Sequence, residues 1–135
     1  MTRKLDHIGI MVRNLEDSLN KYGSYLGLQV EKLEEVEVEG HLDRLAFLPI
    51  GDTRIELIET SATKGFAGDF LKQHGEGIHH IAIQVDDLEK TFNELRAQGV
   101  EFLWDRIIDR DSQTKIAFFK AREFNGVYVE LVERS

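Results

Sequence analysis

Apolar and polar residues first alternate as in a half-buried strand. The next apolar residues recur at the spacing of a helix. Through residues 5–12 the aliphatic side chains alternate at Ile8, Ile10 and Val12. His7 therefore falls on the opposite face of the predicted strand. A helix is predicted over residues 15–26, where apolar residues recur at helical spacing. It is bounded by an N-cap residue and a glycine stop, Asn14 and Gly27.

The same succession returns in the second half of the chain. Residues 78–85 predict a strand whose aliphatic positions are Ile81, Ile83 and Val85. His80 falls on its other face, and alternation sends the preceding His79 to the aliphatic side as a packing or surface residue. A helix begins after Asp87 and ends at Gly99, with an apolar stripe formed by Leu88, Phe92 and Leu95.

Shorter alternating runs predict the remaining strands, at residues 30–38, 42–48, 53–60, 101–104, 115–120 and 127–132. Within the polar stretch 105–114 a loop is predicted at the core, residues 109–112, and Asn125–Gly126 is predicted to be a hairpin turn. A short helix is expected within the connector 61–76. This order predicts an α+β protein of two tandem βαβββ modules, about residues 4–60 and 77–135, forming a curved mixed sheet around a metal-binding cleft.

The metal site follows from an internal repeat. The sequence around His7 recurs around His80, 73 positions later, and the sequence around Glu56 recurs around Glu130, 74 positions later. Internal repeats outrank local propensity in the interpretation of a fold. A histidine on an early strand and a glutamate on a late strand have therefore both been duplicated. If a pseudo-twofold axis relates the modules, the four side chains converge.

Each of these residues alone would indicate little, because single strand histidines and glutamates are usually structural or solvated. Glu56 and Glu130, however, lie between aliphatic neighbours, where a carboxylate without a partner is costly. A divalent cation would satisfy both carboxylates and both imidazoles. We therefore predict a metal site formed by His7, Glu56, His80 and Glu130, with Zn, Co, Ni or Mn as suitable ions. The small residues Gly9 and Ala82 would leave room for a ligand.

Composition limits the number of domains, the types of metal ligand and the classes of partner that fit this sequence. The 135 residues are 41% hydrophobic, which is enough for one domain with a substantial core over 1–135. Because there is no cysteine, any metal must use nitrogen and oxygen ligands. A net charge of −8 argues against nucleic acid or an anionic membrane as partner. We expect a cytoplasmic protein, since no targeting or membrane-spanning pattern is present.

Several stretches resemble the vicinal oxygen chelate superfamily, the glyoxalase/bleomycin resistance/dioxygenase group, and within it the methylmalonyl-CoA epimerases. They are Leu5-Asp6-His7-Ile8-Gly9-Ile10, Ala46-Phe47-Leu48-Pro49-Ile50-Gly51-Asp52-Thr53, the connector Phe70 to Ala82, and Gly126-Val127-Tyr128-Val129-Glu130-Leu131. The resemblance implies a metal-dependent epimerase that moves a proton alpha to a thioester carbonyl. It implies that Glu130 and Glu56 are catalytic, that an acyl-CoA is the substrate, and that the protein is a homodimer.

Three alternatives remain open at this point. The same four ligands are those expected of a glyoxalase I-type lactoylglutathione lyase. His7, His80 and Glu130 alone would form a two-histidine, one-carboxylate set suited to an Fe(II) extradiol-type dioxygenase. A metal-free binding protein of the same fold is also compatible with the sequence, because fold does not determine function.

Overall fold

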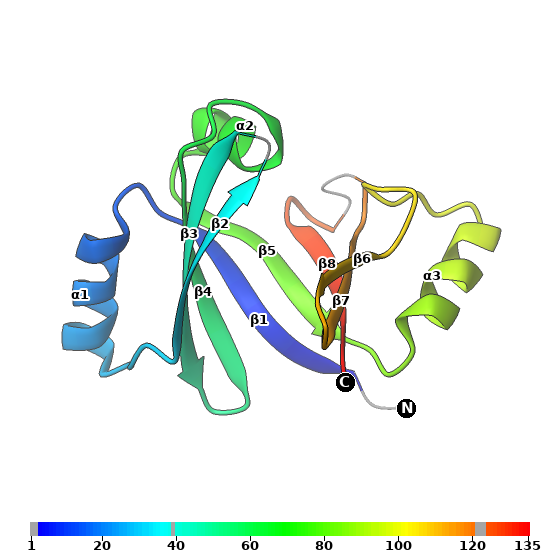
Figure 1. Cartoon of the computed structure of the whole chain (residues 1–135), viewed down its shortest axis with the longest axis horizontal. Helices are drawn as coiled ribbons and strands as arrows, with labels where there is room; N and C mark the ends of the chain where they lie inside the picture. Colours follow the sequence, from blue (N-terminus) through cyan, green and yellow to red (C-terminus); the bar gives the residue numbers. More distant parts are fainter. Residues whose placement is uncertain (1–2, 39, 121–123) are drawn as a thin grey trace. The chain divides into compact units, whose positions relative to one another are not determined.

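In a computed structural model, the predicted two-module α+β architecture is confirmed (Figure 1). The structure describes residues 3–38, 40–120 and 124–135. The first module contains β1 (Lys4–Met11), α1 (Leu15–Leu26), β2 (Lys32–Val38), β3 (His41–Ile50) and β4 (Thr53–Thr60). The connector contains α2 (Gly65–His74). The second module contains β5 (Gly77–Gln84), α3 (Leu88–Ala97), β6 (Ile108–Asp111), β7 (Thr114–Phe118) and β8 (Tyr128–Arg134).

Strand pairing follows the same plan in both modules. In the first module, β1 pairs in parallel with β4, and β4, β3 and β2 continue as an antiparallel succession. In the second module, β5 pairs in parallel with β8, and β8, β7 and β6 continue in the same way. The registers correspond, because Gly9 lies opposite Glu56 and Ala82 lies opposite Glu130.

The chain divides into two compact units that do not coincide with the sequence modules. One unit comprises residues 7–79, and the other comprises residues 80–135 together with the described residues up to Asp6. The division therefore falls within β1, immediately before His7, and within β5, immediately before His80. Residues 4–6 of β1 therefore belong to the unit that contains most of the second module. Residues 77–79 of β5 belong to the unit that contains most of the first module.

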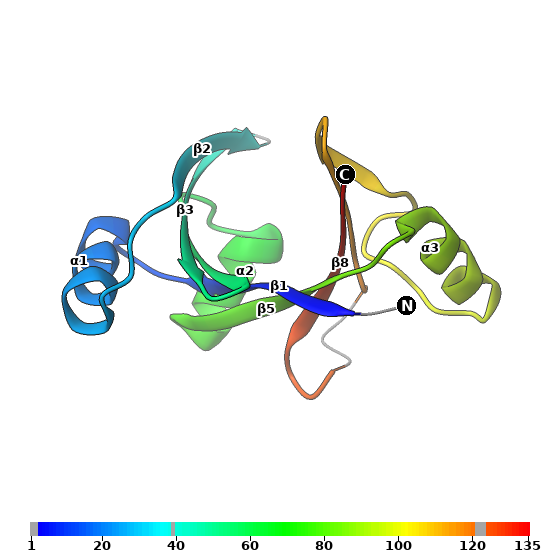
Figure 2. The same ribbon diagram turned by 90° about the horizontal axis from the view of Figure 1, so that it is seen from below.

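Helices α1 and α3 are capped at their N-termini as their sequences predict. Asn14 accepts a hydrogen bond from the backbone N–H of Asp17, and Asp87 accepts one from that of Lys90. Gly27 adopts the left-handed conformation at φ 70°, which ends α1. A core under α1 consists of Val12, Leu15, Ala46, Leu48 and Leu57. In the second module α3 packs against β7 and β8 (Figure 2). The core under this helix includes Val85, Leu88, Phe92, Phe102, Ala117, Phe119, Val129 and Leu131.

A second pair of glutamates ties each helix to its sheet. Glu59 accepts a hydrogen bond from the backbone N–H of Leu15 at 2.8 Å, and Glu133 accepts one from that of Leu88 at 2.8 Å. Both N–H groups belong to a first helical turn, where they have no partner within the helix and where negative charge is favourable. These glutamates lie three positions after Glu56 and Glu130, so the repeat extends to the anchoring of the helices.

Two predictions for the second module were wrong. Residues 101–104 do not form a strand, since Phe102 makes only an isolated bridge with Phe119. The loop predicted at residues 109–112 overlaps β6, which pairs with β7. At the edge of a sheet, polar side chains can face solvent without interrupting the backbone pairing, so polarity alone did not distinguish strand from loop. The Asn125–Gly126 turn is confirmed, with φ angles of 56° and 83° as a type I′ turn requires.

Among the described helices, none combines the length and apolar character needed to cross a membrane.

Candidate metal centre

The first module brings His7 and Glu56 together on one face of its sheet. Because Gly9 is in register with Glu56, the histidine two residues earlier on β1 projects on the same side. His7 Nε2 lies 3.5 Å from Glu56 Oε1. The two residues are only 1% and 3% exposed. The possible metal-ligating atoms of a buried imidazole and a buried carboxylate therefore lie close together.

The second module repeats this arrangement with His80 and Glu130. Ala82 is in register with Glu130, so His80 projects on the same face of β5 as Glu130 does on β8. His80 Nε2 lies 3.4 Å from Glu130 Oε1, and the two residues are 4% and 2% exposed. Each predicted histidine is thus paired with the predicted glutamate of its own module. The small residues predicted to leave room, Gly9 and Ala82, lie directly beside the two glutamates.

A phenylalanine stands against each histidine. Phe47 lies opposite Glu56 on β3 and makes an edge-on contact with His7, with ring centroids 6.3 Å apart. Phe118 lies opposite Glu130 on β7 and makes the same kind of contact with His80 at 5.3 Å. Each imidazole therefore has an aromatic ring edge-on beside it.

No role at the site was predicted for these phenylalanines, although the sequence carries a signal. Ala46-Phe47-Leu48 recurs as Ala117-Phe118-Phe119 at an offset of 71, while the histidines and glutamates recur at 73 and 74. A search at one fixed spacing passes over them.

The separation between the imidazole nitrogen and the carboxylate oxygen in each pair is compatible with binding to a divalent metal ion. Two ligands at about 2.1 Å from a metal lie about 3.0 Å apart at a right angle and about 3.4 Å apart at a tetrahedral angle. The separations of 3.5 Å and 3.4 Å within the two pairs are close to that range, and they are long for hydrogen bonds. Each buried pair, within its own unit, offers one imidazole and one carboxylate as possible ligands to such an ion. Imidazole and carboxylate ligands together suit Zn, Co, Ni or Mn.

The residue before each histidine is also buried, but the two are held differently. His79 is 3% exposed and packs edge-on against Phe66 and Phe70, at centroid distances of 4.5 Å and 4.9 Å. The packing interpretation of His79 is therefore confirmed. Asp6 is 4% exposed and accepts two hydrogen bonds from the Arg134 guanidinium, at 2.7 Å and 2.8 Å. The sequence analysis assigned Asp6 and Arg134 no role.

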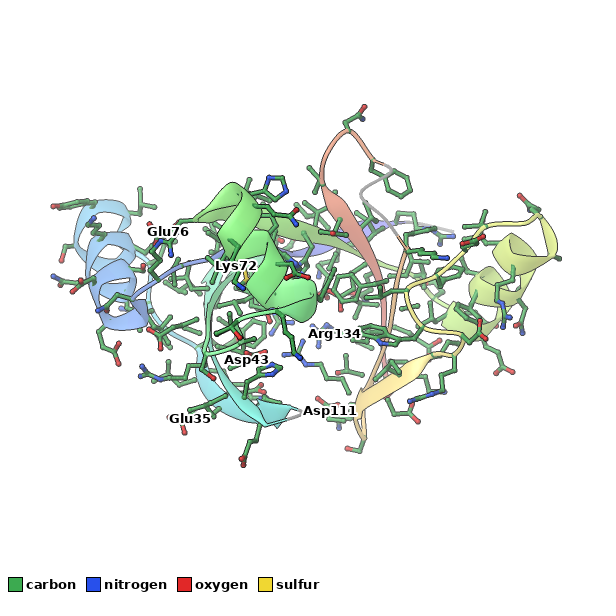
Figure 3. The ribbon with its side chains drawn as sticks, turned by 90° about the horizontal axis from the view of Figure 1, so that it is seen from above. Glu35, Asp43, Lys72, Glu76, Asp111 and Arg134 are labelled. Atoms are coloured by element: carbon green, nitrogen blue, oxygen red, sulfur yellow. The ribbon has the colours of Figure 1, made fainter. Side chains whose placement is uncertain are left out.

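Arg134 projects from the end of β8, four residues after Glu130 (Figure 3). Its Nη1 donates a further hydrogen bond to Thr114 Oγ1 at 3.3 Å. The hydrogen bonds to Asp6 raise the pKa of Arg134 above its usual value. The corresponding position of the first module holds Thr60, which donates to Asp43 at 2.5 Å. The two modules therefore end their site-bearing faces with different polar contacts.

Comparison with known proteins identifies close relatives of two kinds. The chain is 37% identical over 131 residues to the uncharacterized protein YqjC of Bacillus subtilis, covering 96% of this chain and 91% of that protein. It is 33% identical over 138 residues to the mitochondrial methylmalonyl-CoA epimerase of Dictyostelium discoideum, covering 97% of this chain and 78% of that protein.

A solved structure agrees with these relationships. A methylmalonyl-CoA epimerase in complex with methylmalonyl-CoA and NH4+ superposes with a TM-score of 0.88 at 29% identity. The match covers 100% of this chain and 96% of that one. Residues 6–118 also match the model of the Glyoxalase/Bleomycin resistance protein/Dioxygenase superfamily. The protein therefore belongs to this superfamily and is related to its methylmalonyl-CoA epimerases.

Proposed function

We propose that the protein is a metal-dependent epimerase that removes and returns the proton alpha to the thioester carbonyl of an acyl-CoA such as methylmalonyl-CoA. The observation that carries this proposal is the near full-length similarity to methylmalonyl-CoA epimerases, at 33% identity over 97% of the chain for the Dictyostelium enzyme. The duplicated, buried histidine–glutamate pairs supply the residues that this chemistry needs.

In this proposal His7, Glu56, His80 and Glu130 together hold one divalent ion of Zn, Co, Ni or Mn. Two carboxylates balance the charge of the ion, and two neutral imidazoles complete the protein ligands. Such an ion, when bound, polarises a carbonyl oxygen and stabilises the negative charge that develops as the neighbouring proton is lost. The support is the chemistry of the donor set and its burial in both modules.

Glu56 and Glu130 are proposed to move the proton. Inverting one carbon requires that a proton leave from one face and return on the other, which calls for two proton-transfer groups. Carboxylates from the two halves of a duplicated site match that demand. Each carboxylate would accept or return the proton through the oxygen that is not engaged as a ligand. Phe47 and Phe118 place apolar rings beside the two histidines, which would help to keep water out of the proposed site.

The partner in this proposal is an acyl-CoA, which is supported by the substrate complex of the related epimerase. The net charge of −8 continues to argue against nucleic acid and anionic membranes. Homodimer formation remains an expectation from the family resemblance. Light scattering during size-exclusion chromatography would measure it, and a mass close to 15.5 kDa would contradict it.

A glyoxalase I-type lactoylglutathione lyase is the second candidate, because two imidazoles and two carboxylates also suit that reaction. Both reactions begin by removing a proton next to a carbonyl group. They differ in the substrate, so an assay with the hemithioacetal of methylglyoxal and glutathione separates them. Turnover of the hemithioacetal without exchange on an acyl-CoA would favour the lyase.

The experiment that tests the proposal is hydrogen–deuterium exchange at C2 of methylmalonyl-CoA in D2O, followed by NMR. The protein is stripped of metal and then reloaded separately with Co, Zn, Ni and Mn. Exchange that requires the added ion, and that is lost in Glu130→Gln, is the expected result. No exchange with any of the four ions, from protein shown to be folded by circular dichroism, would overturn the epimerase assignment.

A further inference from the structure

Asp6 and Arg134 form an ion pair across 128 positions of sequence. Arg134 Nε donates to Asp6 Oδ1 and Arg134 Nη2 donates to Asp6 Oδ2, at 2.7 Å and 2.8 Å. This two-point geometry fixes direction as well as distance, because the guanidinium fork is planar and rigid. The Asp6 side chain is 3% exposed, and that of Arg134 is 30% exposed. The hydrogen bond to Thr114, which is itself buried, holds the guanidinium from a third direction.

The location of the pair connects it to the proposed metal ligands. Asp6 is joined to His7 by a peptide bond, and Arg134 lies on the same face of β8 as Glu130. Asp6 and Arg134 belong to the same compact unit, and the division between units falls between Asp6 and His7. The ion pair therefore fixes the backbone at the point where the chain enters the strand segment that carries the first histidine.

Two other roles fit the contacts less well. Arg134 is poorly placed to bind a substrate anion through its fork, since Nε and Nη2 already engage the Asp6 carboxylate. A purely stabilising role does not explain the choice of charged residues, because replacing a buried ion pair with apolar side chains is often neutral or favourable. The equivalent residue of the second module, His79, packs edge-on against Phe66 and Phe70.

We propose that Asp6 and Arg134 are positioning residues, whose ion pair orients the backbone at His7 so that this imidazole presents Nε2 for metal binding. The inference rests on the proposed function, because it assumes that His7 is a ligand. It assigns metal affinity, and not chemistry at the substrate, as the property that the pair controls.

The test measures Co(II) binding to Asp6→Asn, Arg134→Met and the double variant, at a temperature where circular dichroism shows every protein to be folded. Dissociation constants come from competition with a chelator, and the visible absorption of bound Co(II) reports the ligand geometry. Each single variant should weaken binding by about tenfold or more, as loss of a residue that orients a metal ligand does. The double variant should be no weaker than the weaker single variant, because both changes remove one shared interaction.

The matched control is Lys120→Met, which removes an exposed ion pair with Glu101 in the same unit and should leave Co(II) binding unchanged. If Asp6→Asn does not fold, Arg134→Lys carries the test, since it keeps the charge and loses the fork. A lower melting temperature with wild-type Co(II) affinity and spectrum would overturn the inference, as would additive losses in the double variant. Failure of the wild-type protein to bind Co(II) stoichiometrically would instead overturn the proposed metal site, and this inference with it.

Discussion

The two modules agree around their histidine–glutamate pairs and differ toward their sheet edges. Each pair has an imidazole-to-carboxylate separation near 3.5 Å, a phenylalanine across the strand and a second glutamate that holds a helix. The outer strands are less alike, since β2 has seven residues and β6 has four. Positions set by strand register have therefore kept their cross-strand partners, while edges and hairpins, which face solvent, have changed length.

The hairpins show how much the lengths differ. Phe47 and Glu56 are joined through a tight turn at Gly51–Asp52, whereas twelve positions separate Phe118 from Glu130. The phenylalanine still lies opposite the glutamate in both modules. Cross-strand contact is thus the conserved relation between the modules, and sequence spacing is not.

The polar contacts beyond the glutamates differ in charge. In the first module a neutral hydroxyl, Thr60, donates to Asp43. In the second module a guanidinium, Arg134, donates to Thr114 and to Asp6. In the second module, charge therefore secures a segment from the other end of the sequence, as the proposed positioning role requires.

The largest effects should come from Glu56→Gln and Glu130→Gln, which compare the modules at the carboxylates. An amide keeps the size of each side chain but can neither transfer the proton in the same way nor balance the metal charge. We expect each variant to lose about 10²- to 10⁴-fold in the rate of C2 deuterium exchange. Co(II) affinity should fall in both, as measured by chelator competition. Full exchange activity in Glu130→Gln would contradict its assigned role, and full activity in Glu56→Gln alone would show that the modules have diverged in function.

Replacement of the histidines tests the same comparison at the nitrogen ligands. His7→Ala and His80→Ala should each weaken Co(II) binding by more than about 100-fold, which exceeds the usual loss from residues that only orient ligands. His74→Ala serves as the matched control, because His74 lies on α2 and is exposed. A loss in His74→Ala as large as in the ligand variants would mean that imidazole content, not the proposed pairs, accounts for binding.

The two histidine–glutamate pairs could be predicted from the sequence because duplication doubled a weak signal. One strand histidine predicts little, but His7 and His80 at matching offsets, followed by Glu56 and Glu130, identified the residues that the structure then paired. The contact between Asp6 and Arg134 had no comparable signal, since no local pattern links two residues 128 positions apart.

The fold was predictable wherever hydrophobic period and capping agreed. The first helix was predicted over 15–26 and is observed as Leu15–Leu26, because a cap, an apolar stripe and a glycine stop all indicate it. The strand Ile108–Asp111 was missed because one of its edges has no strand partner among the described residues, and its sequence resembles a polar loop. Pairing with β7 through the backbone determines that strand, and side-chain polarity carries little information about such pairing.

Leu15→Ala and Leu88→Ala compare the two cores. Each leucine is at the start of its helix and is at most 1% exposed. We expect each substitution to lower the free energy of unfolding by about 2–5 kcal/mol, through lost burial and the cavity left behind. Urea denaturation followed by circular dichroism measures this loss. A cost below about 1 kcal/mol at either position would show that the helix does not depend on its core there.

The smallest effects should come from Glu59→Gln and Glu133→Gln, which remove the charge beneath each helix N-terminus but preserve the shape of the side chain. Each should lower the free energy of unfolding by about 1 kcal/mol, because a carboxylate bonded to a first-turn N–H also interacts favourably with the helix dipole. The loss should be greater for Glu59, whose Oε1 also accepts a hydrogen bond from Arg44 at 3.2 Å. In the described part of the chain, Glu133 has no matching ion pair with an arginine.

Salt separates the two contributions at Glu59. The Arg44 contact is partly exposed and should weaken as ionic strength rises, whereas the bond to the Leu15 N–H should persist. The difference between the two variants should therefore shrink in urea denaturation at high salt, with Glu94→Gln on α3 as a control for an exposed glutamate. If Glu59→Gln and Glu133→Gln lose the same free energy of unfolding at both salt concentrations, Arg44 adds nothing to this anchor. The modules would then be equivalent at their helices, and their divergence would be confined to the sheet edges and to the Asp6–Arg134 contact.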